Sequence, residues 1–472
     1  MYITRHFRIL RFNSIVCSRK SFHVFAKACG ASIINKMLPA NRAPIRMVAG
    51  CPRPLLSVEP TRGLVDEKLR IVVTNLNPMQ EVTLHSLHHS EDMDMWEAFG
   101  HYVSDEHGSV SVAKDSSVGG TYTGVEPMAL MWSLRPVPGS RTGLRLRKRD
   151  VLSPMIFHIS VYNGHIAQGF NQLRPLVTVI IERWYMAPGV QRIDVREKGV
   201  QGTFFFPPGP GPFPCVLDMW GGGGGLVEYR AVLLASHGFA AFALEYLFLE
   251  EVKKVDGNYF EVAYQILQEH PMVIRDRIAL LGLSFGGSVV LSMAANSSVI
   301  KPRCCVCISC SHATPVHSSL SEVYKGLNTL AYKARVENNQ IIWRDIILPI
   351  PTDPAEKVDV GLIKCPILMI VGDDDQNWAS LESAEDMIRM TEKAGNRHLL
   401  EVIIYPGTGH LIEPPYTPHH RASNFMVDGK EKVIMLWGGQ TRLHSYAQED
   451  SWEKILDFFN KHLCRASQQA RL

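Results

Sequence analysis

The feature that most constrains the fold is a short glycine-rich turn around Ser284. The run Gly282-Leu283-Ser284-Phe285-Gly286 follows an apolar segment, residues 277–282, that is typical of a buried strand. Residues 288–295 then have the composition of a helix. A strand that turns sharply into a helix needs small residues around the turn, because side chains there would collide. This setting predicts that Ser284 is a nucleophile at a strand–turn–helix junction.

Two later strands end in residues that could activate such a serine. Residues 366–371 lead into Gly372-Asp373-Asp374-Asp375, and residues 399–405 lead into Pro406-Gly407-Thr408-Gly409-His410. A serine hydroxyl is a poor nucleophile at neutral pH, so it needs a base and a third group that orients the base. The order serine, acid, histidine is the order found in α/β-hydrolases, whose sites lie at the carboxyl ends of the strands.

Each role has more than one candidate residue. We expect Asp375 to be the acid, with Asp374 as the main alternative. We expect His410 to be the base, because it follows a buried strand in a glycine-flanked loop after the acid. His419 and His420 are its nearest rivals in the sequence.

A run of five glycines, residues 221–225, follows an early apolar strand at residues 215–220. A phosphate-binding loop would require Gly-Lys-Ser or Gly-Lys-Thr at its end, and Leu226-Val227-Glu228 follows instead. The run is better interpreted as an oxyanion loop. Gly222 and Gly223 are its candidate backbone donors, together with the backbone N–H of Phe285.

The pattern of apolar residues changes along the chain and predicts two domains. Short alternating segments with turn residues between them indicate a small antiparallel β-sandwich over residues 55–178. Strands then alternate with helices over residues 179–464, which indicates a mainly parallel sheet and an α/β-hydrolase domain. The last helix is expected to carry Trp452, Ile455 and Phe459 on one face, with Asp450 and Glu453 as its capping box.

Composition excludes several classes of function. The formal net charge of +3 is small and gives no reason to expect nucleic-acid binding. No stretch reaches the ~18 apolar residues that cross a bilayer, so no integral membrane segment is expected. The cysteines at 304, 305, 307 and 310 lack a second ligand pair at zinc spacing. We interpret them as part of a buried strand in a reduced, intracellular protein, and no metal is expected.

Both ends of the chain have features of targeting signals. The first 58 residues contain ten Lys or Arg and no Asp or Glu, so residues 1–54 resemble a mitochondrial presequence. The last three residues of the 465–472 tail, Ala470-Arg471-Leu472, resemble a peroxisomal signal. The expectations are therefore the mitochondrial matrix or the peroxisome. Met37 and Met47 are alternative starts that would remove most of the leader and leave the chain in the cytosol.

Several stretches together resemble the acyl-CoA thioesterase and bile acid-CoA:amino acid N-acyltransferase family, over about residues 57–464. They are Ser57-Val58-Glu59-Pro60, Gly124-Val125-Glu126-Pro127-Met128, Lys148-Arg149-Asp150-Val151, Gly211-Pro212-Phe213-Pro214, Gly223-Gly224-Gly225-Leu226-Val227-Glu228-Tyr229-Arg230, Asp374-Asp375-Gln376-Asn377-Trp378, Tyr405-Pro406-Gly407-Thr408-Gly409-His410 and Leu436-Trp437-Gly438-Gly439. The resemblance implies a β-sandwich before an α/β-hydrolase domain, an acyl-CoA substrate and no cofactor. It maps the catalytic triad of the family onto Ser284, Asp375 and His410.

The resemblance also implies a choice of acceptor. Its bile-acid-conjugating branch uses cysteine as nucleophile and its thioesterases use serine, so Ser284 favours hydrolysis to a free fatty acid and CoA. An N-acyltransferase that makes acyl-amino acids is the alternative, and a catalytically inactive acyl-CoA-binding protein is a third. Phe285 and Gln376 depart from the residues usual in the thioesterases, which leaves the substrate preference open. A monomer is the expected state.

Overall fold

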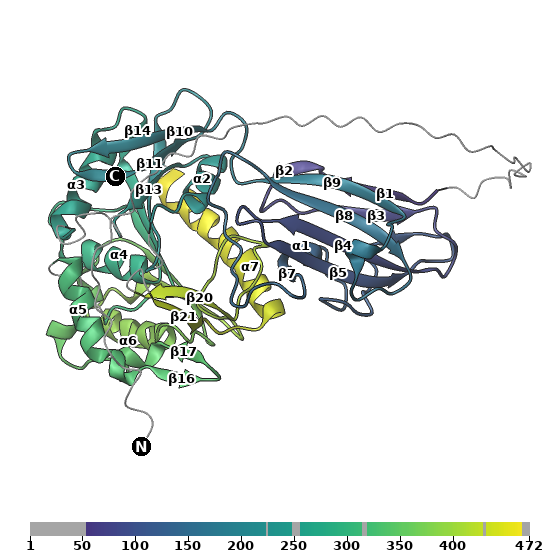
Figure 1. Cartoon of the computed structure of the whole chain (residues 1–472). Coiled ribbons are helices and arrows are strands. Elements are labelled where there is room, and N and C mark those ends of the chain that lie inside the picture. Colours follow the sequence, from purple (N-terminus) through teal and green to yellow (C-terminus); the bar gives the residue numbers. More distant parts are fainter. Residues whose placement is uncertain (1–52, 223–224, 248–254, 314–318, 428–430, 465–472) are drawn as a thin grey trace, which may run out of the picture.

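The computed structural model describes residues 53–222, 225–247, 255–313, 319–427 and 431–464. Residues 1–52 of the expected leader and the C-terminal tail lie outside these residues. Figure 1 shows a strand-rich N-terminal part beside a larger part in which helices cover a sheet. Within the described residues, no helix is both long enough and apolar enough to cross a membrane.

The N-terminal part is the expected β-sandwich. One sheet has the order β1-β3-β6 and the other the order β2-β9-β8-β4-β5-β7. The strands are β1 Leu55–Glu59, β2 Arg62–Leu64, β3 Arg70–Thr74, β4 Glu81–His89, β5 Met95–Val103, β6 Val110–Ser111, β7 Arg135–Pro136, β8 Met155–Asn163 and β9 Val177–Trp184. All pairs are antiparallel except β2 with β9. Alternate residues of both sheets, such as Val73 and Leu84, fill one apolar core with the short helix α1, Ala129–Trp132.

Strand β9 crosses the expected division between residues 178 and 179. It pairs with β8 from Val177 to Arg183 and with β2 as far as Trp184. We therefore propose that the division between the two domains falls after Trp184.

An eight-stranded sheet forms the centre of the larger part, in the order β10-β11-β13-β12-β14-β15-β18-β19. Its strands are β10 Gln191–Glu197, β11 Val200–Phe206, β12 Phe213–Met219, β13 Ala240–Glu245, β14 Val273–Leu283, β15 Cys304–Ile308, β18 Ile367–Gly372 and β19 Leu400–Tyr405. The strands from β13 to β19 in this order are parallel, and β10 and β11 add an antiparallel edge. The sheet is thus mainly parallel, as the alternating pattern predicts, and the α/β-hydrolase class is confirmed.

Helices cover both faces of this sheet, because its strands are apolar on both sides. Leu280 faces a cluster that includes residues of α3 Gly257–Glu269, α4 Phe285–Asn296, α5 Leu320–Leu330 and α6 Ser380–Lys393. Its neighbour Leu281 faces the other cluster, with α2 Tyr229–Ser236 and α7 Thr441–Phe459. In Figure 1, α7 extends from the sheet toward the β-sandwich.

A second, four-stranded sheet was not predicted. Its order is β16-β17-β21-β20, with β16 Arg335–Glu337, β17 Gln340–Ile342, β20 Ala422–Val427 and β21 Glu431–Leu436. Met435 and Trp437 pack with Leu411, which follows His410 directly. The small sheet therefore supports the loop that carries the expected base.

Two local predictions have opposite outcomes. The cysteine run is a buried strand, β15, with free thiols. The capping box at Asp450 and Glu453 is wrong, because α7 begins nine residues before Asp450 at Thr441. Asp450 lies in the middle of the helix, where it binds Lys454 one turn later and the hydroxyl of Tyr405.

Candidate active site

Ser284 occupies the sharp turn between β14 and α4. Its φ of 57° and ψ of −125° are rare for a residue with a side chain, and such strain is typical of functional positions. Glycine is required on both sides of Ser284, because a side chain there would collide with the backbone. A Cβ on Gly282 would lie 2.4 Å from the backbone of Gly286, and a Cβ on Gly286 would lie 2.3 Å from the carbonyl oxygen of Met219. Strand, helix and glycines therefore hold Ser284 in one orientation.

His410 and Asp375 meet Ser284 from two other strand ends. His410 Nε2 lies 2.8 Å from Ser284 Oγ, and His410 Nδ1 lies 2.9 Å from Asp375 Oδ2. All three side chains are almost fully buried. Asp375 also accepts backbone N–H groups from Asn377 and Trp378, each at 2.9 Å. The structure thus brings the three predicted residues into one chain of hydrogen bonds, in the arrangement that activates a serine.

The alternative acid binds elsewhere. Asp374 accepts hydrogen bonds from Arg421 at 2.7 Å, from the backbone N–H of Gly439 at 2.8 Å and from Gln376 at 2.7 Å. Burial opposes ionisation of Asp374, but these donors outweigh it and lower the pKa of the carboxyl group. Asp374 therefore anchors the loop that follows β18, and Gln376 supports this by donating a hydrogen bond to its carboxylate.

The alternative histidines also have structural partners. His419 Nε2 bonds to the carbonyl oxygen of Gly438 at 2.9 Å, and His420 Nε2 accepts the backbone N–H of Leu146 at 3.3 Å. Burial lowers the pKa of both imidazoles. Neither has a hydrogen bond to Ser284 among the contacts of the described residues.

Two tryptophans of the site were not predicted to have a role. Trp378 Nε1 donates to Ser284 Oγ at 2.8 Å. Trp437 stacks on His410 with ring centroids 5.8 Å apart and planes 16° apart. Both residues lie in the stretches that carry the family resemblance, and that was the only sequence signal for them.

The glycine loop lies beside the nucleophile. Gly221 is so close that a Cβ there would be 2.9 Å from Ser284 Cβ. Gly222 follows at an open position, whereas Gly223 lies outside the described residues. Before the loop, Asp218 and Arg230 form a buried ion pair, and the Arg230 guanidinium lies 5.0 Å from the Trp220 ring centroid. This pair ties the start of the loop to α2.

Phe285 has a structural explanation. Its side chain is buried in the apolar cluster on the α4 face of the sheet, together with Met219 and Val289. Its backbone begins α4 directly after Ser284. The position therefore combines an apolar packing role with a backbone N–H at the first residue of α4.

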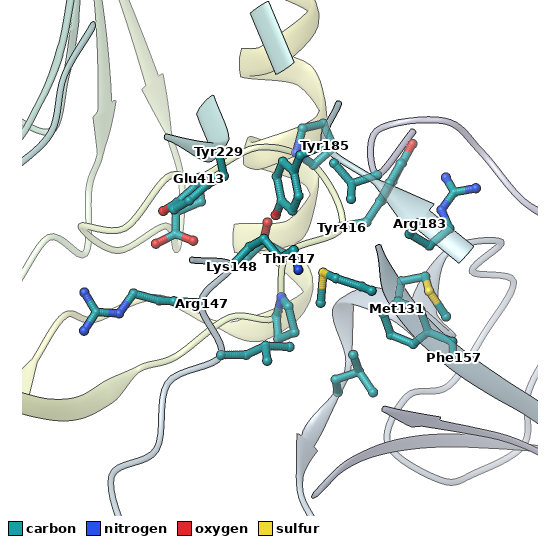
Figure 2. Close-up of a pocket in the computed structure, with 16 residues that line it drawn as sticks. Met131, Arg147, Lys148, Phe157, Arg183, Tyr185, Tyr229, Glu413, Tyr416 and Thr417 are labelled. Atoms are coloured by element: carbon teal, nitrogen blue, oxygen red, sulfur yellow. The ribbon is translucent and has the colours of Figure 1, made fainter. Parts of the chain in front are cut away.

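A pocket lies between the β-sandwich and the hydrolase part (Figure 2). Tyr229 and Glu413 line one side of it, and Phe157 and Arg183 line the opposite side. Tyr229 contacts Trp220, which precedes the glycine loop, and Glu413 follows His410 by three residues. Two residues that line the pocket are therefore neighbours, by contact or in sequence, of the segments that form the site.

The pocket lining combines apolar side chains with buried polar groups that lack hydrogen-bond partners among the described residues. Met131, Leu146 and Phe157 contribute apolar surface, while Tyr229 Oη and two nitrogens of Arg183 are buried without hydrogen-bond partners in the described chain. Burial lowers the pKa of Arg183 to about 10. Unsatisfied donors of this kind are expensive unless a ligand or water meets them.

A serine at a strand–helix turn, in contact with an imidazole held by a carboxylate, defines an α/β-hydrolase with a site at the carboxyl edge of its sheet. Residues 66–197 match the family model "Acyl-CoA thioester hydrolase/BAAT N-terminal region", and residues 255–465 match "BAAT / Acyl-CoA thioester hydrolase C terminal". The chain belongs to this family, in which BAAT denotes bile acid-CoA:amino acid N-acyltransferase.

Three relatives show the range of the family. Peroxisomal succinyl-coenzyme A thioesterase of Mus musculus is 37% identical, over 86% of this chain and 96% of the relative. Acyl-coenzyme A thioesterase 2, mitochondrial, of Homo sapiens is 38% identical, over 89% and 86%. Bile acid-CoA:amino acid N-acyltransferase of Mus musculus is 37% identical, over 86% and 97%. Relatives named for thioester hydrolysis and for N-acyl transfer thus have similar sequence identity to this chain.

Proposed function

We propose that the protein hydrolyses fatty acyl-CoA to a free fatty acid and CoA, with Ser284, His410 and Asp375 as its catalytic triad. The observation that carries the proposal is the hydrogen bond of 2.8 Å between Ser284 Oγ and His410 Nε2, with the carboxylate of Asp375 on the other ring nitrogen. Thioesterases among the relatives supply the substrate class.

The reaction follows from these contacts. His410 Nε2 takes the proton of Ser284 as Oγ bonds to the thioester carbonyl carbon, and the carbonyl electron pair moves to its oxygen. The C–S bond then breaks, and the sulfur of CoA leaves with its electron pair and takes the proton from His410. Water, deprotonated in turn by His410, attacks the acyl-enzyme. The fatty acid leaves when the C–Oγ bond breaks, and Oγ recovers a proton from His410.

The oxyanion is assigned to backbone donors. We infer that the N–H of Phe285 is one donor and that Gly222 or Gly223 supplies the other. The position of Phe285 at the start of α4 and the closeness of the loop to Ser284 support this assignment. One such donor contributes roughly 3–4 kcal/mol to lowering the barrier.

The N-acyltransferase remains a second candidate, because one relative named for that reaction is 37% identical over 86% of the chain. A thiol assay of CoA release across a series of acyl lengths, with and without glycine or taurine, separates the two. We expect CoA release that does not depend on the amine, and fatty acid as the product by mass spectrometry. An acyl-amide as the main product would instead assign the transferase, and absence of CoA release would exclude both.

The terminal segments support a proposal for localisation. We infer import into mitochondria through residues 1–54 or into peroxisomes through Ala470-Arg471-Leu472, since the relatives include a mitochondrial and a peroxisomal thioesterase. The full chain should colocalise with one of these compartments when imaged in cells by antibody. Deleting residues 1–54 or the last three residues should remove the corresponding signal. Diffuse cytosolic staining of the full chain would contradict both.

A further inference from the structure

Trp378 places a fixed hydrogen-bond donor on the nucleophile of the triad. An indole N–H can only donate, so Ser284 Oγ must accept from Trp378 Nε1 at 2.8 Å. At the other end, the carboxylate of Asp375 can only accept, so His410 Nδ1 carries a proton. His410 Nε2 is then the acceptor, and the proton of Ser284 is directed at it. The carboxylate thus selects the reactive tautomer of His410, and Trp378 adds a fixed donor to Ser284 Oγ.

The indole is also held rigidly. Trp378 is 4% exposed and packs in the apolar cluster on the α4 face of the sheet. Its backbone N–H donates to Asp375 at 2.9 Å, so one residue contacts both the acid and the nucleophile of the triad. A donor that is already in place needs no reorganisation when charge develops on its acceptor.

The hydrogen bond from Trp378 stabilises the transition states of acylation and deacylation to different extents in the proposed reaction. Before acylation, Oγ is a hydroxyl oxygen and already a good acceptor, so the hydrogen bond exists in the ground state. In the acyl-enzyme, Oγ is the alkoxy oxygen of an ester, which is a weak acceptor, and it becomes strongly negative only when it leaves. An interaction accelerates a step only if it is stronger in the transition state than in the ground state. The hydrogen bond from Trp378 therefore accelerates deacylation more than acylation.

We propose that Trp378 is a catalytic residue of deacylation, whose indole N–H stabilises Ser284 Oγ as it leaves the acyl group. The inference rests on the proposed thioester hydrolysis. Water loses a proton to His410 Nε2 and bonds to the acyl carbon, and the C–Oγ bond then breaks. Oγ takes the electron pair while Trp378 donates to it, and the proton on His410 passes to Oγ. Trp378 keeps its own proton throughout.

The test measures the two half-reactions separately in the Trp378→Phe variant. Rapid mixing with an acyl-CoA gives the rate of the first CoA release, and intact-protein mass spectrometry after acid quench follows the acyl-enzyme. We expect a near-normal first release, a deacylation rate lowered about 10- to 100-fold, and accumulation of the acyl-enzyme. Benzothienylalanine at position 378 replaces the N–H by sulfur at almost the same shape, so it gives the same readout if the phenylalanine variant is unstable.

Trp452→Phe is the matched control, because Trp452 Nε1 also donates a hydrogen bond of 2.8 Å, in this case partly buried, to Asp66, away from the triad. This variant should keep both rates. Equal slowing of acylation and deacylation by Trp378→Phe, or no slowing of either, would overturn the role of Trp378 while the thioesterase assignment stands. A wild-type protein that neither releases CoA nor acylates Ser284 would overturn the proposed function itself.

Discussion

Replacement of Ser284 with alanine should abolish CoA release from acyl-CoA. In triad hydrolases the loss of the nucleophile lowers kcat by roughly 10⁶-fold, because no other group can form the acyl-enzyme. Ser284→Ala keeps the Cβ and adds no strain beyond the φ of 57° that serine already has, so the melting temperature should hardly change. A thiol assay with excess variant protein, together with a thermal melt, measures both quantities.

Ser309 offers a matched control for that variant. It also has a positive φ, of 47°, and it is fully buried at the end of β15, where its hydroxyl has no hydrogen-bond partner in the described chain. Ser309→Ala should therefore retain activity. Turnover by Ser284→Ala at the wild-type rate would show that another residue is the nucleophile.

Replacement of Asp375 with asparagine should lower kcat by about 10⁴-fold. The amide can offer an N–H to His410 Nδ1, which places the proton of the neutral ring on Nε2, and Nε2 then cannot accept the proton of Ser284. The variant keeps the shape of the side chain, so the effect should fall on kcat more than on KM. Steady-state kinetics of the purified variant measure both.

Asp374→Asn is the control for the second prediction. Asp374 binds Arg421 and the backbone of Gly439, and among the described residues it has no hydrogen bond to His410, so its replacement should cost stability rather than chemistry. A thermal melt and kcat together distinguish the two costs. If Asp374→Asn lost more kcat than Asp375→Asn, the assignment of the acid would have to be reversed.

The meeting of the three side chains could be predicted because each follows a strand, and strand ends of a parallel sheet meet at one edge. Ser284, Asp375 and His410 are far apart in sequence, yet the order of motifs along the chain was enough to pair them. The sandwich and the mainly parallel sheet followed from the change in apolar period near residue 180. These features depend on local pattern and on sheet topology, and both are visible in a single sequence.

What could not be predicted depends on tertiary contacts. The indole of Trp378 reaches Ser284 only because the loop after β18 folds back over the turn at α4. The strands β16 and β17 have three residues each, too short for a periodic signal. In α7, the polar residues before Trp452 obscured the true start at Thr441, so Asp450 was mistaken for a cap.

The central claim is that Ser284 forms the acyl-enzyme. The most direct measurement is acid quench of the wild-type protein within the first turnovers with an acyl-CoA, followed by proteolysis and tandem mass spectrometry. The account predicts one added acyl group per chain, located on the peptide that contains Ser284 and absent from Ser284→Ala. An acyl group on a different residue, or rapid CoA release with no acylated peptide in either the wild-type protein or Trp378→Phe, would contradict it.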